Sequence, residues 1–255
     1  MPAACTVAHF RIRLALQQPT RRIGGTVVLI DGRPKSRMEA RLHILTVASR
    51  KGGAGKTMVT SLLGVEAERV GAGPVCLIDA DPMRGLTMWW NRRVADTPVL
   101  VAHDNGLVPA IAAAAAHGAK LLIIDTAPHL EEITVEAVAR ATLVLIPVRP
   151  SPQDLWAVGT TVEMAKRAGV PFLFVINAVK HGVSATAEAA IALSEYGQVA
   201  KQTLYDRTAY GGTAVIGQTA PERDPSGKAA DEARGLWECV IKKMVGGGNE
   251  QASAA

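Results

Sequence analysis

Residues 44–57 read ILTVASRKGGAGKT, an apolar run followed by a glycine-rich loop that ends in Lys-Thr. The run is typical of a buried strand, and the loop is typical of a phosphate-binding loop that opens a helix. The common pattern G-x-x-x-x-G-K-[ST] has glycine at position 50, where this chain has Arg50. Three later glycines supply the close backbone approach instead, and Lys51 precedes them. The stretch therefore predicts a phosphate site of a variant type.

Each position of this loop has a predicted task. The backbone N–H groups from Gly52 to Lys56 form a concave nest for a β-phosphate, and the following helix N-terminus adds partial positive charge. Lys56 is expected to reach the β- and γ-oxygens, and the Thr57 hydroxyl to ligate Mg²⁺. Lys51 lies on the wrong side of the glycines for such a role. From the loop alone, two interpretations of Lys51 remain: a solvated loop lysine or a functional residue.

Two further apolar runs end in aspartates. In VCLIDADPMRG, residues 75–85, Asp79 and Asp81 lie on the same side of an extended backbone because side chains alternate with period two. In LLIIDTAPHL, residues 121–130, a buried-type run ends at Asp125. Carboxylates at strand ends beside a phosphate loop suit Mg²⁺ and an attacking water. For the first run, a strand end with an Asp-Pro turn stays the alternative.

Strand-like runs alternate with helical stretches along the chain. The runs are 44–49, 75–79, 99–102, 121–124, 142–148 and 172–176. The helical stretches are about 57–70, 85–92, 107–117, 131–140, 154–168 and 184–195. Because βα units alternate, we expect an α/β fold with a doubly wound, mainly parallel sheet flanked by helices, and with its ligands at the carboxyl ends of the strands.

These motifs resemble the ParA/MinD family of deviant Walker A P-loop ATPases, and most closely the short ParA proteins of plasmid and chromosome partition. The resemblance runs from about Leu42 to about Met244. It implies that Lys51 crosses a dimer interface to the partner's nucleotide and that Asp81 orients the hydrolytic water. It also implies that Asn177 contacts the adenine edge, although a capping or turn role is the alternative. Met83 departs from the family, which usually has glutamine there.

Taken together, the loop and the resemblance predict three sets of site residues. The nucleotide contacts are Lys51, Gly52, Gly53, Ala54, Gly55, Lys56, Thr57, Met58 and Asn177. The catalytic residues are Lys51, Lys56 and Asp81, and the Mg²⁺ ligands are Thr57, Asp79 and Asp125.

The positive charge lies at the N-terminus. Residues 1–37 carry seven arginines and lysines against one aspartate, a net of +6, whereas the whole chain is +5, so residues 38–255 sum to −1. We expect three segments: a basic extension 1–37, an ATPase domain 38–246 and a flexible tail 247–255. For the extension, three hypotheses stay open: a mis-assigned start with Met38 as the first residue, a basic arm for nucleic acid, and a targeting peptide.

The function implied by the resemblance is an ATP-driven partition or positioning switch. ATP and Mg²⁺ would hold a homodimer that binds DNA without sequence preference, and a ParB-like adaptor would stimulate slow hydrolysis. A cytoplasmic, nucleoid-associated location fits the three scattered cysteines and the absence of a long apolar run. DNA contacts are expected among basic residues of the last third: Lys180, Arg207, Arg223, Lys228, Arg234, Lys242 and Lys243. The cargo and the replicon are not determined.

The alternative function is a MinD-like membrane-cycling regulator of cell division or positioning. It requires a basic amphipathic C-terminal helix. Residues 231–244 place an apolar stripe beside Lys242 and Lys243, but we expect this stripe to pack on the core. A metabolic P-loop ligase would need a substrate-binding insertion, which is not found, and a bacterial tyrosine kinase would need a C-terminal tyrosine cluster.

Overall fold

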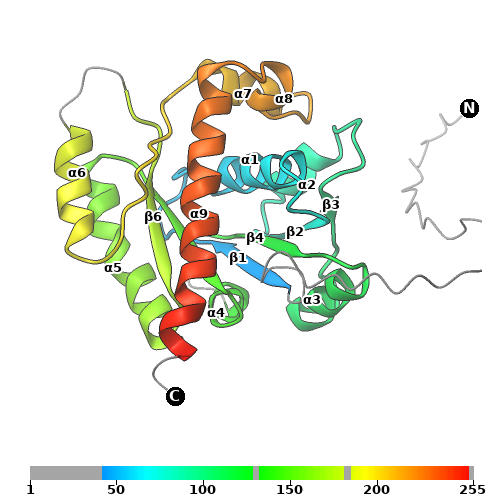
Figure 1. Cartoon of the computed structure of the whole chain (residues 1–255), viewed down its shortest axis with the longest axis horizontal. Coiled ribbons are helices and arrows are strands. Elements are labelled where there is room, and N and C mark those ends of the chain that lie inside the picture. The colour runs from blue at the N-terminus through cyan, green and yellow to red at the C-terminus, as the bar shows by residue number, and fades with distance from the viewer. Residues whose placement is uncertain (1–41, 129–131, 181–184, 253–255) are drawn as a thin grey trace, which may run out of the picture. The chain divides into compact units, whose positions relative to one another are not determined.

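The structure is a computed structural model that describes residues 42–128, 132–180 and 185–252. Its centre is a six-stranded sheet with the order β3-β2-β4-β1-β5-β6, in which neighbouring strands pair in parallel (Figure 1). The strands are β1 (His43–Val47), β2 (Val75–Ala80), β3 (Val99–Leu100), β4 (Leu121–Thr126), β5 (Leu143–Val148) and β6 (Phe172–Ile176). The predicted doubly wound parallel sheet is confirmed.

Helices join the strands and cover both faces of the sheet (Figure 1). The first six are α1 (Lys56–Arg69), α2 (Gly85–Trp90), α3 (Leu107–Ala116), α4 (Glu132–Ala139), α5 (Pro152–Arg167) and α6 (Ala185–Ser194). They match the predicted stretches to within about two residues. Three more follow β6: α7 (Thr208–Ala214), α8 (Ala220–Arg223) and α9 (Lys228–Ala252).

The two faces of the sheet belong to different core layers. In β4, Leu121 and Ile123 pack with α1 and α9, whereas Leu122 and Ile124 pack with α3. All six residues of β4 are buried, as expected for a parallel strand covered on both faces. The middle position of β1, between β4 and β5, places the loop after β1 at the centre of the carboxyl edge of the sheet.

Ordinary capping signals set the helix ends near this edge. Ser151 caps α5, because its hydroxyl oxygen accepts a hydrogen bond from the Asp154 backbone N–H at 3.3 Å and Pro152 occupies the first turn. Thr219 and Glu222 form a capping box at α8. These caps hold the loops after β5 and before α8 in defined positions.

Helix α9 differs from the expectation at its end. Residues 245–255 read as a tail without regular structure, but α9 continues through three glycines to Ala252. Each glycine costs about 1 kcal/mol relative to alanine in a helix interior, yet a helix already formed and packed propagates more easily than a new one nucleates. The domain boundaries at 38 and 246 stay predictions.

The apolar stripe of α9 faces the core, as predicted. Leu236, Trp237, Val240 and Met244 are each at most 6% exposed and belong to the same cluster as α1 and β1. A stripe that is already covered by its own domain is not available to a membrane surface. Among the described helices, none is long and apolar enough to cross a bilayer.

Candidate nucleotide-binding site

The phosphate-binding loop joins β1 to α1 and depends on glycine at two points. Gly53 and Gly55 have φ values of +74° and +94°, a region that side-chain-bearing residues rarely adopt. A Cβ on Gly55 would stand 2.2 Å from the Asn177 amide nitrogen, so any larger residue would displace Asn177. Around Gly52, by contrast, there is open space within 4 Å. The loop is therefore tight where it meets the protein and open where a phosphate would lie.

Lys56 stands at the base of this loop as the first residue of α1. Its side chain is buried, and its Nζ donates a hydrogen bond to the Ser49 carbonyl at 3.2 Å. Burial lowers the pKa of the Lys56 ammonium, while the charges of Asp125 and Asp81 act in the opposite direction. A cation held in a buried position and paired only partly is suited to an anionic ligand, as predicted for Lys56.

Thr57 and Asp125 meet where the metal was predicted. The Thr57 hydroxyl donates to Asp125 Oδ2 at 2.6 Å. Asp125 is fully buried, and its Oδ1 has no hydrogen-bond partner within the described ranges. Burial raises the pKa of the Asp125 carboxyl to about 7, although the Thr57 hydrogen bond and the Lys56 charge lower it. An unpartnered buried carboxylate oxygen beside a hydroxyl is a place that a cation would satisfy.

The donor set fits Mg²⁺ rather than a metal held by protein alone. Within the part of the chain that the structure describes, no group of three or more histidine, cysteine, aspartate or glutamate side chains could hold a metal ion. Mg²⁺ usually takes one or two protein ligands and completes its shell with water and substrate phosphates. Thr57 and Asp125 fit that pattern, and their assignment as metal ligands stays a prediction.

Asp79 has a different set of contacts from the one expected of a metal ligand. Its Oδ2 accepts hydrogen bonds from the backbone N–H and the hydroxyl of Thr87, both at 2.7 Å, and its Oδ1 accepts one from Asp81 N at 3.3 Å. Both carboxylate oxygens thus hold the first turn of α2 and the start of the following loop. His103 Nε2 lies 2.7 Å from the Asp79 carbonyl and adds a further hold on this strand end. Oδ1 accepts only this one long hydrogen bond among the described residues, so the assignment of Asp79 as a metal ligand stays a prediction.

Asp81 lies in the loop between β2 and α2 and is half-buried. Its Oδ1 accepts a hydrogen bond from Met83 N at 2.9 Å, which closes a tight Asp-Pro turn. Its charge is among those that raise the pKa of buried Lys56, against the larger effect of burial. This placement agrees with the predicted role in orienting a water, which stays a prediction.

Asn177 closes the other side of the loop. It follows β6, is 2% exposed, and donates from Nδ2 to the Ala54 carbonyl at 2.7 Å. Its Oδ1 is buried without a partner in the described ranges. The structure therefore gives Asn177 a loop-holding role that the sequence did not suggest, and the predicted adenine contact remains a prediction.

Lys51 and Arg149 are, with Arg50, exposed cations at the phosphate-binding loop. Lys51 is exposed, and its ammonium makes no ion pair with any described residue, which agrees with either hypothesis for it. Arg149, in the loop after β5, lies against Gly53: a Cβ built on Gly53 would stand 3.4 Å from its Nη2. Sequence reasoning missed Arg149 because no local signal relates it to a loop almost a hundred residues earlier.

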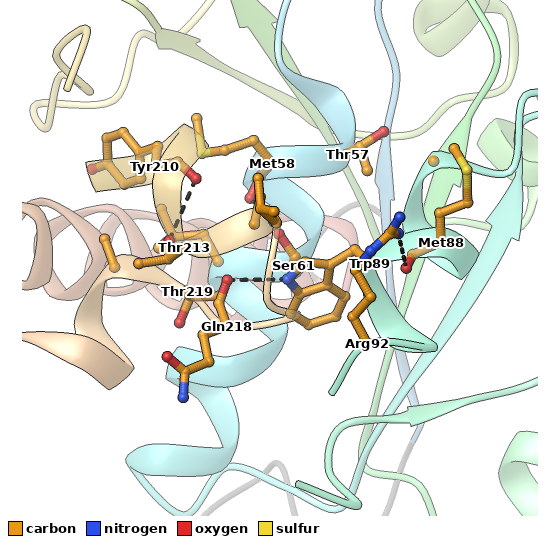
Figure 2. A pocket seen from close by; sticks show the side chains of 15 residues that line it. Thr57, Met58, Ser61, Met88, Trp89, Arg92, Tyr210, Thr213, Gln218 and Thr219 are labelled. Carbon is orange, nitrogen blue, oxygen red and sulfur yellow. Dashed lines mark hydrogen bonds between the residues drawn. The ribbon is translucent and has the colours of Figure 1, made fainter. Parts of the chain in front are cut away.

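A cavity of about 440 Å³ opens beside Thr57 between α1, α2, α7 and α8 (Figure 2). Figure 2 shows the Trp89 indole across its middle, with the indole N–H donating to the Gln218 carbonyl at 3.1 Å. Met58, a predicted nucleotide contact, also lines the cavity. The cavity is lined mostly by apolar atoms, with Arg92 as its charged residue, and it extends from Thr57 toward α7.

Two of the seven cations predicted to contact DNA are bound to carboxylates. Arg207 donates from Nε to Glu232 Oε1 at 2.8 Å, and Tyr210 donates to the other oxygen of this buried carboxylate at 2.8 Å. Arg234 pairs with Asp231 and donates to the Pro225 carbonyl. The guanidinium of Arg207 is therefore paired with Glu232 inside the domain, which speaks against the predicted contact with DNA. Lys180, Arg223, Lys228 and Lys242 are exposed and Lys243 is half-buried, and none makes an ion pair within the described ranges.

Comparison with known proteins gives one family and several relatives. The model of a family described as VirC1 protein matches residues 42–203. The chain is 36% identical over 128 residues to maintenance of carboxysome distribution protein A of Halothiobacillus neapolitanus, covering 49% of the chain and 58% of that protein. It is 34% identical over 116 residues to protein ParA of Rhizobium radiobacter, covering 44% and 51%. The chain thus spans about half the length of the curated relatives it matches.

Solved structures agree on the fold. The septum site-determining protein MinD of Pyrococcus horikoshii, complexed with Mg-ADP, matches with a TM-score of 0.65 at 18% identity, covering 79% of the chain and 97% of that structure. At this level of identity the match concerns the fold alone.

Proposed function

Because the chain belongs to the VirC1 protein family, within the ParA/MinD-like ATPases, we propose that it is an ATP-dependent positioning ATPase. In this proposal it binds Mg-ATP, dimerises in that state, and then binds DNA without sequence preference. Hydrolysis, slow until a ParB-like partner stimulates it, releases the DNA. The observation that carries the proposal is the Thr57–Asp125 hydrogen bond beside buried Lys56, at the carboxyl edge of a parallel sheet.

The chain's own side chains divide the work. Bound Mg-ATP supplies the phosphoanhydride that water attacks. Lys56 places a fixed positive charge at the base of the loop, and Thr57 with Asp125 would hold the metal. Asp81, oriented by its hydrogen bond from Met83 N, would accept a hydrogen bond from the attacking water. Asp79 holds the start of the following loop and the first turn of α2 through its hydrogen bonds, and its predicted contact with the metal stays a prediction.

The positioning role is supported by the kind of relative found. One is by its name a carboxysome distribution protein, and another is a ParA protein. The cargo of this chain is left open by these differences. A MinD-like membrane cycle is the weaker candidate, because the apolar stripe of α9 is buried in the core.

We expect ATP, but not ADP, to drive dimerisation through Lys51. Replacing Lys51 with alanine should abolish the ATP-dependent dimer and its activity, while nucleotide affinity in the monomer changes by less than about three-fold, because the exposed Lys51 ammonium contacts no described part of its own chain. Sedimentation velocity with ATP, ADP and no nucleotide measures the dimer fraction.

The matched control is Lys166→Ala, an exposed lysine in the last turn of α5 that removes the same charge. An unchanged ATP-dependent dimer in Lys51→Ala, with unchanged turnover, would return Lys51 to the role of a solvated loop residue.

We expect DNA binding by the ATP form to depend on a local patch, since residues 38–255 carry a net charge of only −1. The double variant Lys242→Gln/Lys243→Gln should weaken binding to duplexes of any sequence. It should also make the slope of log affinity against log salt less negative by roughly 1 to 2, at about 0.9 per lost phosphate contact. Fluorescence anisotropy between 50 and 300 mM salt, about the range over which such binding collapses, measures both.

Two comparisons make this test specific. Lys166→Gln/Arg167→Gln removes the same charge from the last turn of α5 and should leave DNA affinity unchanged. A chain without residues 1–37 separates the basic extension from the ATPase domain. If that shortened protein with ATP fails to bind DNA, while the full chain binds equally with ATP, ADP or no nucleotide, the switch hypothesis is wrong and the extension is the DNA-binding element.

A further inference from the structure

Arg149 lies over the phosphate-binding loop in a position that no motif assigns to it. We propose that Arg149 is a further nucleotide-binding residue of this chain, whose guanidinium contacts the α- or β-phosphate from the side of the loop opposite the metal pair. The inference rests on the proposed function, since it assumes that the loop holds a nucleotide. It adds a specific residue to that site and a prediction about which ligands depend on it.

The placement of the guanidinium is the first argument. The three atoms nearest to a Cβ built on Gly53 all belong to Arg149: Nη2 at 3.4 Å, Cζ at 3.8 Å and Nη1 at 3.9 Å. The planar end of the side chain, not its aliphatic stem, therefore lies against the loop. Because Gly53 carries no side chain, nothing separates the guanidinium from the loop backbone.

The backbone holds Arg149 in this place. It directly follows β5, which pairs with β1, and Ala48 N at the start of the phosphate-binding loop donates to the Leu145 carbonyl at 3.0 Å. Ser151 N donates to the Arg149 carbonyl at 2.8 Å and closes a tight turn, and the Ser151 side chain then caps α5. The backbone of Arg149 is thus fixed on one side by strand β5 and on the other by the capped helix α5, which makes this a rigid position for a loop residue.

The charge of Arg149 is the second argument. It makes no hydrogen bond or ion pair from its guanidinium with any residue in the described ranges. Seven of the described arginines have a carboxylate partner, whereas Arg149 shares the lack of one with Arg50, Arg92 and Arg223. An arginine without a partner beside a nest of backbone N–H groups concentrates positive potential at one point. Guanidinium groups match phosphate oxygens in a bidentate geometry, so a phosphate is the ligand that this arrangement fits.

The order of the strands indicates which phosphates are involved. The Thr57–Asp125 pair, which would hold the metal between the β- and γ-phosphates, involves β4 on one side of β1. Arg149 follows β5 on the other side of β1, and Asn177 follows β6 beyond it. The phosphate chain would run from the β4 side toward the β5 side. Arg149 is therefore placed for the α- and β-phosphates, which ATP and ADP share.

The test is nucleotide binding by the full chain with Arg149→Met and Arg149→Gln, both of which remove the charge and keep much of the side chain. We expect the Kd values of fluorescent ATP and ADP analogues to rise together by about ten-fold or more, the size of one lost charge-assisted hydrogen bond. Inorganic tripolyphosphate should lose the same factor as a competitor. Arg149→Lys should recover part of the affinity, because it restores the charge without the planar fork.

Arg167→Met is the matched control. It removes the same charge from the far end of α5, roughly 24 Å along a helix with a rise of about 1.5 Å per residue, and should bind as the unaltered chain does. Unchanged ADP affinity in both Arg149 variants would overturn the proposal. So would a loss confined to ATP, or a loss for nucleotides without one for tripolyphosphate, which would place the guanidinium at the γ-phosphate or at the base. If the unaltered chain binds no nucleotide, the proposed function itself fails.

Discussion

Replacing Lys56 with alanine is expected to abolish binding of both ATP and ADP, with a loss of affinity on the order of 100-fold or more. Lys56 is buried at the base of the phosphate-binding loop, where the charges of Asp125 and Asp81 act on its ammonium and its hydrogen bond within the described residues goes to the Ser49 carbonyl. Removing the ammonium leaves two carboxylates near the phosphates without a compensating cation. The phosphates then lose their attraction to Lys56 and are repelled by the two carboxylates. Isothermal titration with Mg-ATP and Mg-ADP measures the effect.

Folding must be separated from binding in this experiment. Lys56→Gln is shorter by one bond but keeps most of the side chain and a hydrogen-bond donor, so it should fold as the unaltered chain does and still fail to bind. Lys166→Ala, on the exposed surface of α5, is the control for loss of one lysine. ATP affinity within about three-fold of normal in both Lys56 variants would remove Lys56 from the nucleotide site.

Replacing Asp81 with alanine is expected to lower the turnover of ATP by a factor on the order of 100 or more while ATP binding is retained. The carboxylate lies in the turn before α2, its charge acts on Lys56, and its side-chain hydrogen bond among the described residues goes to Met83 N rather than to the phosphate-binding loop. The ATP form and its dimer should then accumulate. Single-turnover hydrolysis and sedimentation with ATP measure these two consequences.

A structural explanation must again be excluded, because Asp81 Oδ1 accepts the hydrogen bond from Met83 N that shapes the turn. Asp81→Asn preserves that acceptor and removes only the charge, so it should show the same loss of turnover. Asp96→Ala, an exposed aspartate after α2, should hydrolyse ATP normally. Equal turnover by the unaltered chain and by Asp81→Asn would rule out the assignment of Asp81.

Most of the fold was predictable because its signals are local. Continuous apolar runs predicted five of the six strands nearly in full. A parallel strand that is covered on both faces consists of consecutive apolar residues, so the run itself marks the bounds of the strand. The short β3 was predicted two residues too long, and α9 ended eight residues later than Met244. Both differences arise at element ends, where packing and propagation outweigh residue preferences.

The phosphate loop was predictable for the same reason. Gly53, Gly55, Lys56 and Thr57 are neighbours in the chain, and their spacing alone indicates the loop and the helix that follows. Asp125 was predictable as the last residue of an apolar run, because strand ends in a parallel sheet converge on one edge. Such features depend on distances along the backbone, which the amino-acid order determines directly.

Side-chain partners across the chain were decided only by the tertiary structure. Asn177 holds the Ala54 carbonyl from 123 residues away, and Arg149 lies on Gly53. Glu232 pairs with Arg207, a predicted DNA contact, and Thr87 bonds one oxygen of Asp79, a predicted Mg²⁺ ligand. The physical reason is that a charged or hydrogen-bonding group is chemically able to bond to many different partners. The packing of the folded chain brings only a few of them within bonding distance of a buried group. The order of the residues determines which helices and strands form. The packing of those elements determines which polar groups bond to other groups of the domain and which remain available to a ligand.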